Sequence, residues 1–293
     1  MNMKKLNLAL IGVALMLSTA LVNCSKDEKT TNTGTCIGTT YKTDKDVTFM
    51  TIDYNADKRP IKINDFDDST GVADGYTTIA YTSTTITEKG YNSSGTLGET
   101  TVNTIGSNGK VVSSTYNYND GDYIDISTST YEYNSEGYLI KQTENHTSPS
   151  VSTTTYDYTI TGGNVSHVVT VGDGYTNTTD YTYYTDKPLK FDLWNLNFTA
   201  FGKGNSNPVK KSTGTSTYSS KKKGVAISGI RMFLNRSTTL HNTNKSASAV
   251  NYVDSDDYTY EYNADNYITK ETDTYLAVDF TDVWVTKCTY ACD

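Results

Sequence analysis

The sequence predicts an all-β protein: a large curled antiparallel meander of tyrosine-rich hairpins that forms an open sheet or a half-barrel. Three observations support this prediction. Tyrosine (25 residues) far outnumbers phenylalanine (7), and proline is rare (4); tyrosine and threonine suit a pleated surface that is half exposed to water. Short alternating segments are separated by turn signals about every dozen residues. No helical period is sustained after the N-terminal leader.

One hairpin motif recurs along the chain. It reads Tyr-x-Tyr, then Asn, Asp or Thr, then two or three turn residues and a further alternating segment. Residues i and i+2 of a strand share a face, so each copy places two rings on one side. Gly137 and Asn266 occupy turn positions suited to positive φ, and pairs such as Tyr133 with Tyr138 are expected to lie across the hairpin. Copies occur at 51–61, 116–121, 131–139, 156–158, 181–183 and 260–268.

Other segments interrupt or extend this pattern. Gly-rich turns at 106–109 and 161–164 separate further pairs of alternating segments. The apolar stretch 189–201 is expected to form a short helix or a plug at one end of the sheet. The Ser/Thr/Lys-rich stretches 210–223 and 235–248 are predicted loops.

The N-terminus resembles a bacterial lipoprotein signal. A basic start precedes an apolar run, 6–21, that is too short and too early to be a membrane span. Leu21 lies three residues before Cys24, and polar residues follow at once. In such signals the cysteine takes a diacylglycerol and becomes the first residue after cleavage. Asn23 departs from the small residue usual before the cut, so the alternative is an ordinary secretory leader in which Cys24 is incidental.

This leader divides the chain into a signal peptide (1–23), a flexible tether (24–40) and a single all-β domain (41–293). The stretch 25–28, Ser-Lys-Asp-Glu, also resembles the acidic, lysine-containing export signal of Bacteroidota surface lipoproteins. The resemblance implies a lipid-anchored protein of the outer membrane, exposed at the cell surface. The membrane is then its first partner. The acyl chains hold the protein there, and each buried methylene contributes ~0.8 kcal/mol to the free energy of membrane binding.

Composition and motif content argue against several classes of protein function. A net charge of −8 and a pI near 4.9 lack the basic footprint of a nucleic-acid-binding protein. Sparse aliphatic residues argue against an α/β enzyme with a deep apolar core. The sequence contains no Gly-x-Ser-x-Gly, no phosphate-binding glycine loop and no His-Glu-x-x-His. We therefore expect neither catalysis nor a cofactor.

The three cysteines after Cys24 are Cys36, Cys288 and Cys292, so at most one internal disulfide forms. A strand over 288–292 separates its two cysteines by about 13 Å at ~3.3 Å per residue, beyond the ~7 Å limit between bonded Cα atoms; a turn there removes this objection. The alternative joins Cys36 to Cys288 or Cys292 and ties the two ends of the domain. In the chain-entropy model a loop that long is worth about 5 kcal/mol.

Two acidic clusters, Asp65/Asp67/Asp68 and Asp254/Asp256/Asp257, supply oxygen ligands of the kind that Ca²⁺ prefers. Neither has the spacing of an EF-hand, and solvated turn residues are the favoured interpretation. The first cluster is kept as a weak calcium candidate, and no other metal site is expected.

The remaining candidates are aromatic rings and histidines. Tyrosine faces beside Asp and Asn can hold sugar rings, with Trp194 and Trp284 as further platforms. The favoured alternative is that the rings build the packed face of the sheet itself. No specific ligand-binding residue is assigned. The three histidines are interpreted as surface or loop imidazoles: His146, His167 and His241.

The tyrosine hairpins Tyr131–Lys141 and Tyr260–Lys270, and the insertion at 188–193 and 201–209, resemble a family of Bacteroidota lipoproteins of unknown function with a porin-like fold. A weaker similarity is to the tyrosine–aspartate repeats of bacterial shell-forming toxins, although their arginine is mostly absent here. The family resemblance implies a large curled antiparallel sheet and no assigned activity. It does not imply a pore, because polar residues fill many outward positions where a membrane barrel carries an apolar band.

Together these features predict an outer-membrane lipoprotein of unknown activity with a binding or structural role in the cell envelope. The alternative is a surface lipoprotein that binds a glycan. A glycan hydrolase is the weakest hypothesis, since it requires two carboxylates at glycosidase spacing in one cleft. The partner beyond the membrane is a glycan or another envelope protein.

Lipidation at Cys24 is directly testable. We expect a fatty-acid analogue to label the wild-type chain in cells and to leave Cys24→Ala unlabelled, with the variant moving to the soluble fraction because it loses its acyl chains. A Cys24→Ala variant that stays membrane-bound contradicts the assignment.

Overall fold

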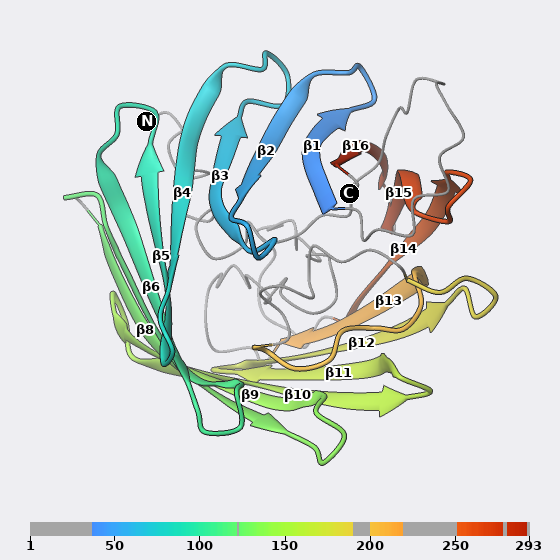
Figure 1. Cartoon of the computed structure of the whole chain (residues 1–293). Helices are drawn as coiled ribbons and strands as arrows, with labels where there is room; N and C mark the ends of the chain where they lie inside the picture. Colours follow the sequence, from blue (N-terminus) through green and yellow to red (C-terminus); the bar gives the residue numbers. More distant parts are fainter. Residues whose placement is uncertain (1–36, 122, 190–199, 219–250, 278–279, 292–293) are drawn as a thin grey trace.

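A computed structural model describes residues 37–121, 123–189, 200–218, 251–277 and 280–291. These residues form sixteen antiparallel strands in chain order, and the last strand pairs with the first. Figure 1 shows the strands arranged around one closed ring. The predicted all-β meander is confirmed, but the open sheet or half-barrel is wrong because the sheet closes into a barrel. The described residues contain no helix.

The strands have the following bounds: β1 (Ile37–Thr43), β2 (Thr48–Tyr54), β3 (Pro60–Phe66), β4 (Ala73–Tyr81), β5 (Thr85–Asn92), β6 (Leu97–Ile105), β7 (Val111–Asn119), β8 (Ile124–Tyr133), β9 (Leu139–Ser148), β10 (Ser152–Thr161), β11 (Asn164–Gly172), β12 (Tyr175–Tyr183), β13 (Val209–Tyr218), β14 (Asn251–Tyr262), β15 (Ile268–Ala277) and β16 (Phe280–Ala291).

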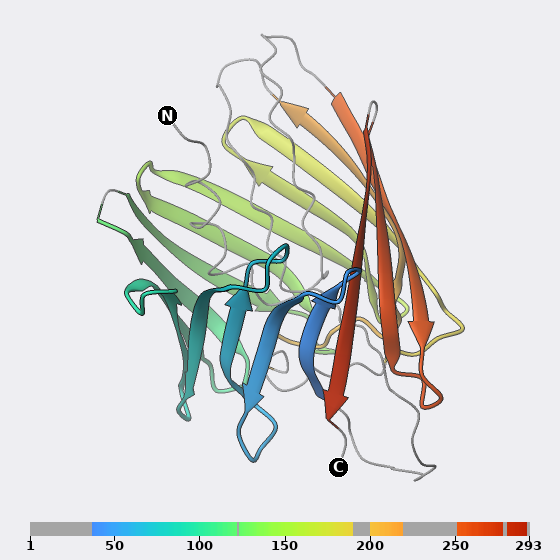
Figure 2. The ribbon, with the colours of Figure 1, turned by 90° about the horizontal axis from the view of Figure 1, so that it is seen from above.

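Closure depends on one ladder between the two ends of the domain. β1 and β16 pair antiparallel, with Ile37 opposite Ala291 and Tyr41 opposite Cys288. Both views show the two strands side by side (Figures 1 and 2). A sheet of this width that stays open exposes two edges of unpaired backbone groups, and closure removes both. The sequence carries no signal for this pairing, because it joins segments about 250 residues apart and local patterns report only near neighbours.

The barrel has two rims. We call the end where β1 begins and β16 ends the terminal rim, and the other end the opposite rim. At the terminal rim, turns such as 134–138 and 263–267 are built on an asparagine whose side-chain oxygen accepts backbone N–H groups: Asn134 accepts from Tyr138, and Asn263 from Tyr267. Gly137 (φ 94°) and Asn266 (φ 61°) take the positive φ that the sequence predicts.

In five strands, two of which end in a Tyr-x-Tyr motif, a tyrosine near the end of the strand bonds to the neighbouring hairpin. Its hydroxyl donates to a backbone carbonyl near the start of the preceding strand, which ties adjacent hairpins together along the terminal rim. The Tyr133 hydroxyl reaches the Val111 carbonyl at 2.7 Å. Tyr133 pairs with Leu139, whereas Tyr138 belongs to the turn, so the expected Tyr133–Tyr138 pair is wrong. The other bonds of this kind are Tyr54 to Gly38, Tyr81 to Pro60, Tyr183 to Val165 and Tyr290 to Ile268.

A loop between β12 and β13 lies against the terminal rim. Ala200 and Phe201 are buried, and the Phe201 ring meets the Tyr131 ring edge-on at 5.3 Å. Asn205 accepts a hydrogen bond from the Val165 backbone at 2.8 Å, and Asn207 exchanges hydrogen bonds with Asn164. The plug predicted near 189–201 is thus a loop in its described residues, and 190–199 lie outside them.

Two other boundaries differ from prediction. The loop expected over 210–223 is strand β13 as far as Tyr218. Its Ser and Thr residues pair with β12 on one side and with β14 on the other. Residues 219–223 and 235–248 lie outside the described residues. β1 begins at Ile37, inside the segment predicted as a tether.

The core lies on the inner face of the wall. Rings are part of it: five tyrosines within strands are less than a tenth exposed, which confirms the interpretation that they build the packed face of the sheet. They are Tyr41, Tyr131, Tyr156, Tyr158 and Tyr258.

The disulfide between the two ends of the domain, which we call the cysteine clasp, stays a prediction. The β1–β16 ladder indicates which two cysteines are placed to form it. Cys288 is buried beside Tyr41 and is a free thiol. The last described pair is Ile37 opposite Ala291, the residues next to Cys36 and Cys292, which themselves lie outside the described residues. We therefore predict that the clasp joins Cys36 to Cys292.

We expect non-reducing peptide mapping of the exported protein to recover a Cys36–Cys292 cross-linked peptide. Cys36→Ser and Cys292→Ser are each expected to lower the free energy of unfolding by up to about 5 kcal/mol, the value for a very long loop. The double variant is expected to lose no more than either single one. Recovery of both cysteines as free thiols contradicts the prediction, and Cys288→Ser is the control that leaves the cross-link intact.

Candidate functional site on the lumen wall

Cross-strand register separates the inner face of the barrel from its outer face. Directly paired residues share a face, and alternate residues along a strand share it too. Asn103 is fully buried and lies in one row with Ser114, Ser129 and Glu144, its successive partners from β6 to β9. In a single-layer barrel such buried positions face the lumen.

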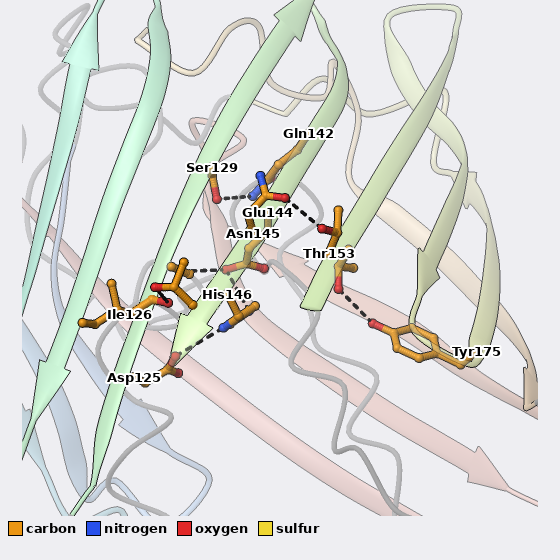
Figure 3. Close-up of polar contacts among 12 residues, drawn as sticks. Asp125, Ile126, Ser129, Gln142, Glu144, Asn145, His146, Thr153 and Tyr175 are labelled. Atoms are coloured by element: carbon orange, nitrogen blue, oxygen red, sulfur yellow. Dashed lines mark hydrogen bonds and ion pairs between the residues drawn. The ribbon is translucent and has the colours of Figure 1, made fainter. Parts of the chain in front are cut away.

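These four residues and Gln142 form what we call the lumenal polar patch. The Gln142 amide donates to the Ser129 hydroxyl at 3.3 Å (Figure 3). The Asn103 amide donates to the Glu88 carboxylate at 2.9 Å. Neither amide oxygen has a hydrogen-bond partner, although Gln142 is only 2% exposed.

His146 lies beside the patch, between two carboxylates. Its Nδ1 is 3.2 Å from Asp125 (Figure 3) and its Nε2 is 3.5 Å from Glu144. The Ser127 hydroxyl donates to the same Glu144 oxygen at 3.2 Å. The hydrogen bond to Glu144 outweighs partial burial and, with Asp125, raises the pKa of His146 to about 9. The prediction of a surface or loop imidazole is wrong for this residue, which is half-buried on a lumen-facing position of β9.

The lumen wall is acidic. Burial raises the pKa of Glu88 to about 7 against the opposing hydrogen bond from Asn103. Burial likewise raises the pKa of Asp65 and of Glu99 to about 7. Carboxyl groups on lumen-facing register positions are Asp65, Glu88, Glu99, Asp125, Glu144, Asp254, Asp256, Glu271, Asp273 and Asp282. Mid-strand lysines such as Lys141 and Lys270 take the outer face.

The second acidic cluster divides between the two faces. Asp254 and Asp256 are buried in the lumen, and Asp256 accepts a hydrogen bond from Ser212 at 2.7 Å. Burial, followed by the charge of Asp256, raises the pKa of Asp254. Asp257 points outward and lies 3.5 Å from Lys211.

The three residues of the weak calcium candidate, Asp65, Asp67 and Asp68, are not brought together around one point either. Asp65 is a lumen residue of β3, whereas Asp67 accepts hydrogen bonds from Ser69 and Thr70 within its own turn. These bonds lower the pKa of Asp67 to about 2, and Asp68 is exposed. Across the described residues no three His, Cys, Asp or Glu side chains are placed to hold a metal ion.

The other predicted residues lie elsewhere. His167 is on the outer wall, 2.7 Å from Asp180. Trp284 is 53% exposed and pairs with Asp273 on the lumen side. The remaining candidates lie outside the described residues: Cys24, Cys36, Cys292, Trp194 and His241.

The outer wall is rich in threonine and paired charges. Thr176 and Thr178 face Thr217 and Thr215 across the β12–β13 ladder, and Lys270 contacts Glu261 at 2.7 Å. Among the described residues this wall carries no apolar band, ~25 Å tall, of the kind found on a lipid-spanning barrel. Exposed apolar residues gather instead at the opposite rim, where they form a collar beside acidic turns: Val72, Leu97, Tyr123, Ile124, Val151, Val171, Val253, Leu276 and Val283.

No helix in the described part of the chain is long and apolar enough to cross a membrane.

Sequence reasoning missed Asn103 and Gln142. The available signal was the spacing of Gln142, Glu144 and His146, which puts three polar side chains on one face of a strand. That signal was ambiguous because the intervening Thr143 and Asn145 are polar too. Only closure of the barrel identifies which of the two faces is inside.

Comparisons with known proteins identify the fold. No protein-family model and no curated protein matches the chain. The structure is similar to a porin-like protein from Bacteroides uniformis ATCC 8492 (TM-score 0.51, 13% identity, 89% of this chain and 98% of that chain covered). It is also similar to one from Bacteroides vulgatus ATCC 8482 (TM-score 0.53, 13% identity, 87% and 98% covered). The chain therefore has the fold of a porin-like barrel.

The position of His146 predicts a pH-dependent contribution to stability. Its pKa is higher in the folded protein (about 9) than its ordinary 6.5, so protonation favours folding; the contribution is complete below the ordinary value and is lost as pH rises through about 9. In urea titrations we expect His146→Gln to lower the free energy of unfolding at about pH 6, and the deficit to shrink by about pH 10.

His167→Gln, on the exposed outer wall, is the matched control for this series. Comparing each variant with the wild type at the same pH cancels the titration of the buried carboxyl groups. A deficit for His146→Gln that stays constant over the whole pH range contradicts the assignment.

Proposed function

We propose that this protein is a lipid-anchored envelope protein of the bacterial outer membrane whose barrel lumen binds a polar solute without catalysis. The observation that carries the proposal is the lumenal polar patch, where two buried amide oxygens have no partner. An unpartnered buried polar atom costs ~1–3 kcal/mol, and such atoms in folded proteins are usually satisfied by solvent or a ligand.

The outer wall supports anchoring through Cys24 rather than spanning of the bilayer. Threonine and ion pairs such as Lys270–Glu261 cover the wall, and charged side chains cost ~2–4 kcal/mol each on the lipid face of a barrel near the midplane. An acyl anchor holds such a barrel at the membrane surface. The likeness to porin-like proteins is consistent with an envelope location.

A glycan is the second candidate for the solute. Tyr131 and Tyr156 lie beside Glu144 on the inner face, and rings next to carboxylates are a combination that holds sugars. Both rings are less than a tenth exposed, so a sugar would contact their edges and hydroxyl groups. Another envelope protein stays a candidate partner for the collar at the opposite rim.

Neighbouring residues on opposite faces provide a test of solute binding. We expect one or more members of a panel of polar solutes (neutral oligosaccharides, amines, amino acids) to raise the melting temperature of the mature chain, because a ligand that binds only the folded state stabilises it. Ser129→Leu, on the lumen face, is expected to abolish that shift. Thr130→Leu, on the outer face, is expected to keep it.

Circular dichroism confirms that both variants are folded before they are compared. If no solute in the panel changes the melting temperature, or if both variants respond as the wild type does, the lumen is not the binding site.

A further inference from the structure

The two unpartnered amide oxygens indicate the chemistry of the missing partner. Asn103 is 0% exposed and Gln142 is 2% exposed, and each already uses its amide nitrogen, toward Glu88 at 2.9 Å and Ser129 at 3.3 Å. Above its pKa of about 7 the Glu88 carboxylate is ionised and only accepts hydrogen bonds, so the Asn103 amide then turns its nitrogen to Glu88 and its oxygen away. The partner that this oxygen lacks is a hydrogen-bond donor.

The charges around the patch indicate which class of hydrogen-bond-donating ligand fits it. Glu144 belongs to the patch and Glu88 is hydrogen-bonded to it, and both interact electrostatically with the Tyr131 hydroxyl. Glu99 and Asp125 lie on lumen positions farther along β6 and β8. His146 is the cation among these groups, and it is already held by Asp125 and Glu144. Since acceptors and negative charge are in surplus, a ligand that supplies N–H groups and positive charge fits better than a neutral or anionic one.

The spacing of the two oxygens sets the length of the ligand. Asn103 is on β6 and Gln142 on β9, three strands apart, or about 14 Å across the strands at ~4.8 Å per strand, and Gln142 is a further two residues along its strand from the row of Asn103. Ser114 and Ser129 lie between them and are both buried. A single small ammonium ion cannot contact both ends, whereas a flexible chain with several amines can.

We propose that the lumenal polar patch binds a linear organic polycation, with amine N–H groups donating to the Asn103 and Gln142 oxygens and with Glu88 and Glu144 balancing the charge. This inference rests on the proposed function, since it names the class of solute that the lumen takes. It also explains why two amides remain on a buried wall where Leu or Met would avoid an unpartnered oxygen.

Spermine is the probe, measured by isothermal titration calorimetry on the full mature chain. We expect Gln142→Met, which keeps the side-chain length without the amide, to weaken spermine binding about tenfold, as for the loss of one charge-assisted hydrogen bond. Asn103→Leu is expected to act similarly. Without ligand, Gln142→Met is expected to be at least as stable as the wild type, because it removes the unpartnered oxygen. This stability measurement separates a binding role from a purely structural one.

Ser212→Ala is the matched control. Ser212 is equally buried on the lumen face, but it donates to Asp256 on the neighbouring strand β14, away from the patch, so its variant is expected to bind spermine as the wild type does. Propylamine, which has one amine, is expected to bind more weakly than spermine because it reaches only one oxygen.

Two outcomes overturn the inference. If spermine binds Gln142→Met and Asn103→Leu as tightly as the wild type, it occupies another part of the acidic surface. If maltotriose binds and spermine does not, the solute is a neutral sugar; the ligand class is then wrong while the proposed function stands. Failure of the proposed function itself appears separately, as a melting temperature that no solute in the panel changes.

Discussion

The pairing of β1 with β16 is the constraint on which the rest of the structure depends. It closes the ladder, so no strand of the barrel presents an unpaired edge. Closure also separates the two faces of a sheet that is polar on both. The apolar cluster covers only part of the inner wall, so stability also relies on continuous backbone pairing, on the tyrosine hydroxyl bonds at the terminal rim and on the loop packed against that rim.

Closure turns polar side chains into a lumen with its own chemistry. Carboxyl groups that would titrate normally on an open sheet become buried, which raises the pKa of Glu88 and Glu99 to about 7. The same burial leaves Asn103 and Gln142 with unpartnered oxygens. The outer wall, with threonine and ion pairs, stays suited to water. This division suits the function that we propose, in which an anchor holds the barrel at a membrane and the lumen receives the ligand.

The hairpins were predictable because their signals are local. Asn134 and Gly137 form one turn, Asn263 and Asn266 form another, and in each the side chain or the φ angle explains the bend. The site was less predictable. His146 resembles a surface histidine in sequence, and its carboxylate partner Asp125 comes from the preceding strand through a register that a bulge shifts by one residue. β13 was mistaken for a loop because Ser, Thr and Lys are common to both structures.

The sequence by itself determined the strand period, the turn chemistry and the packed tyrosine face, because each depends on residues a few positions apart. It also supplies the hypothesis of export and lipidation at Cys24. Tertiary structure alone decided that the sheet closes, since Ile37 and Ala291 meet only when the whole meander has curled through a full turn. It likewise decided which polar face is the interior: alternation marks two faces, but when both are polar only closure assigns one of them to the lumen.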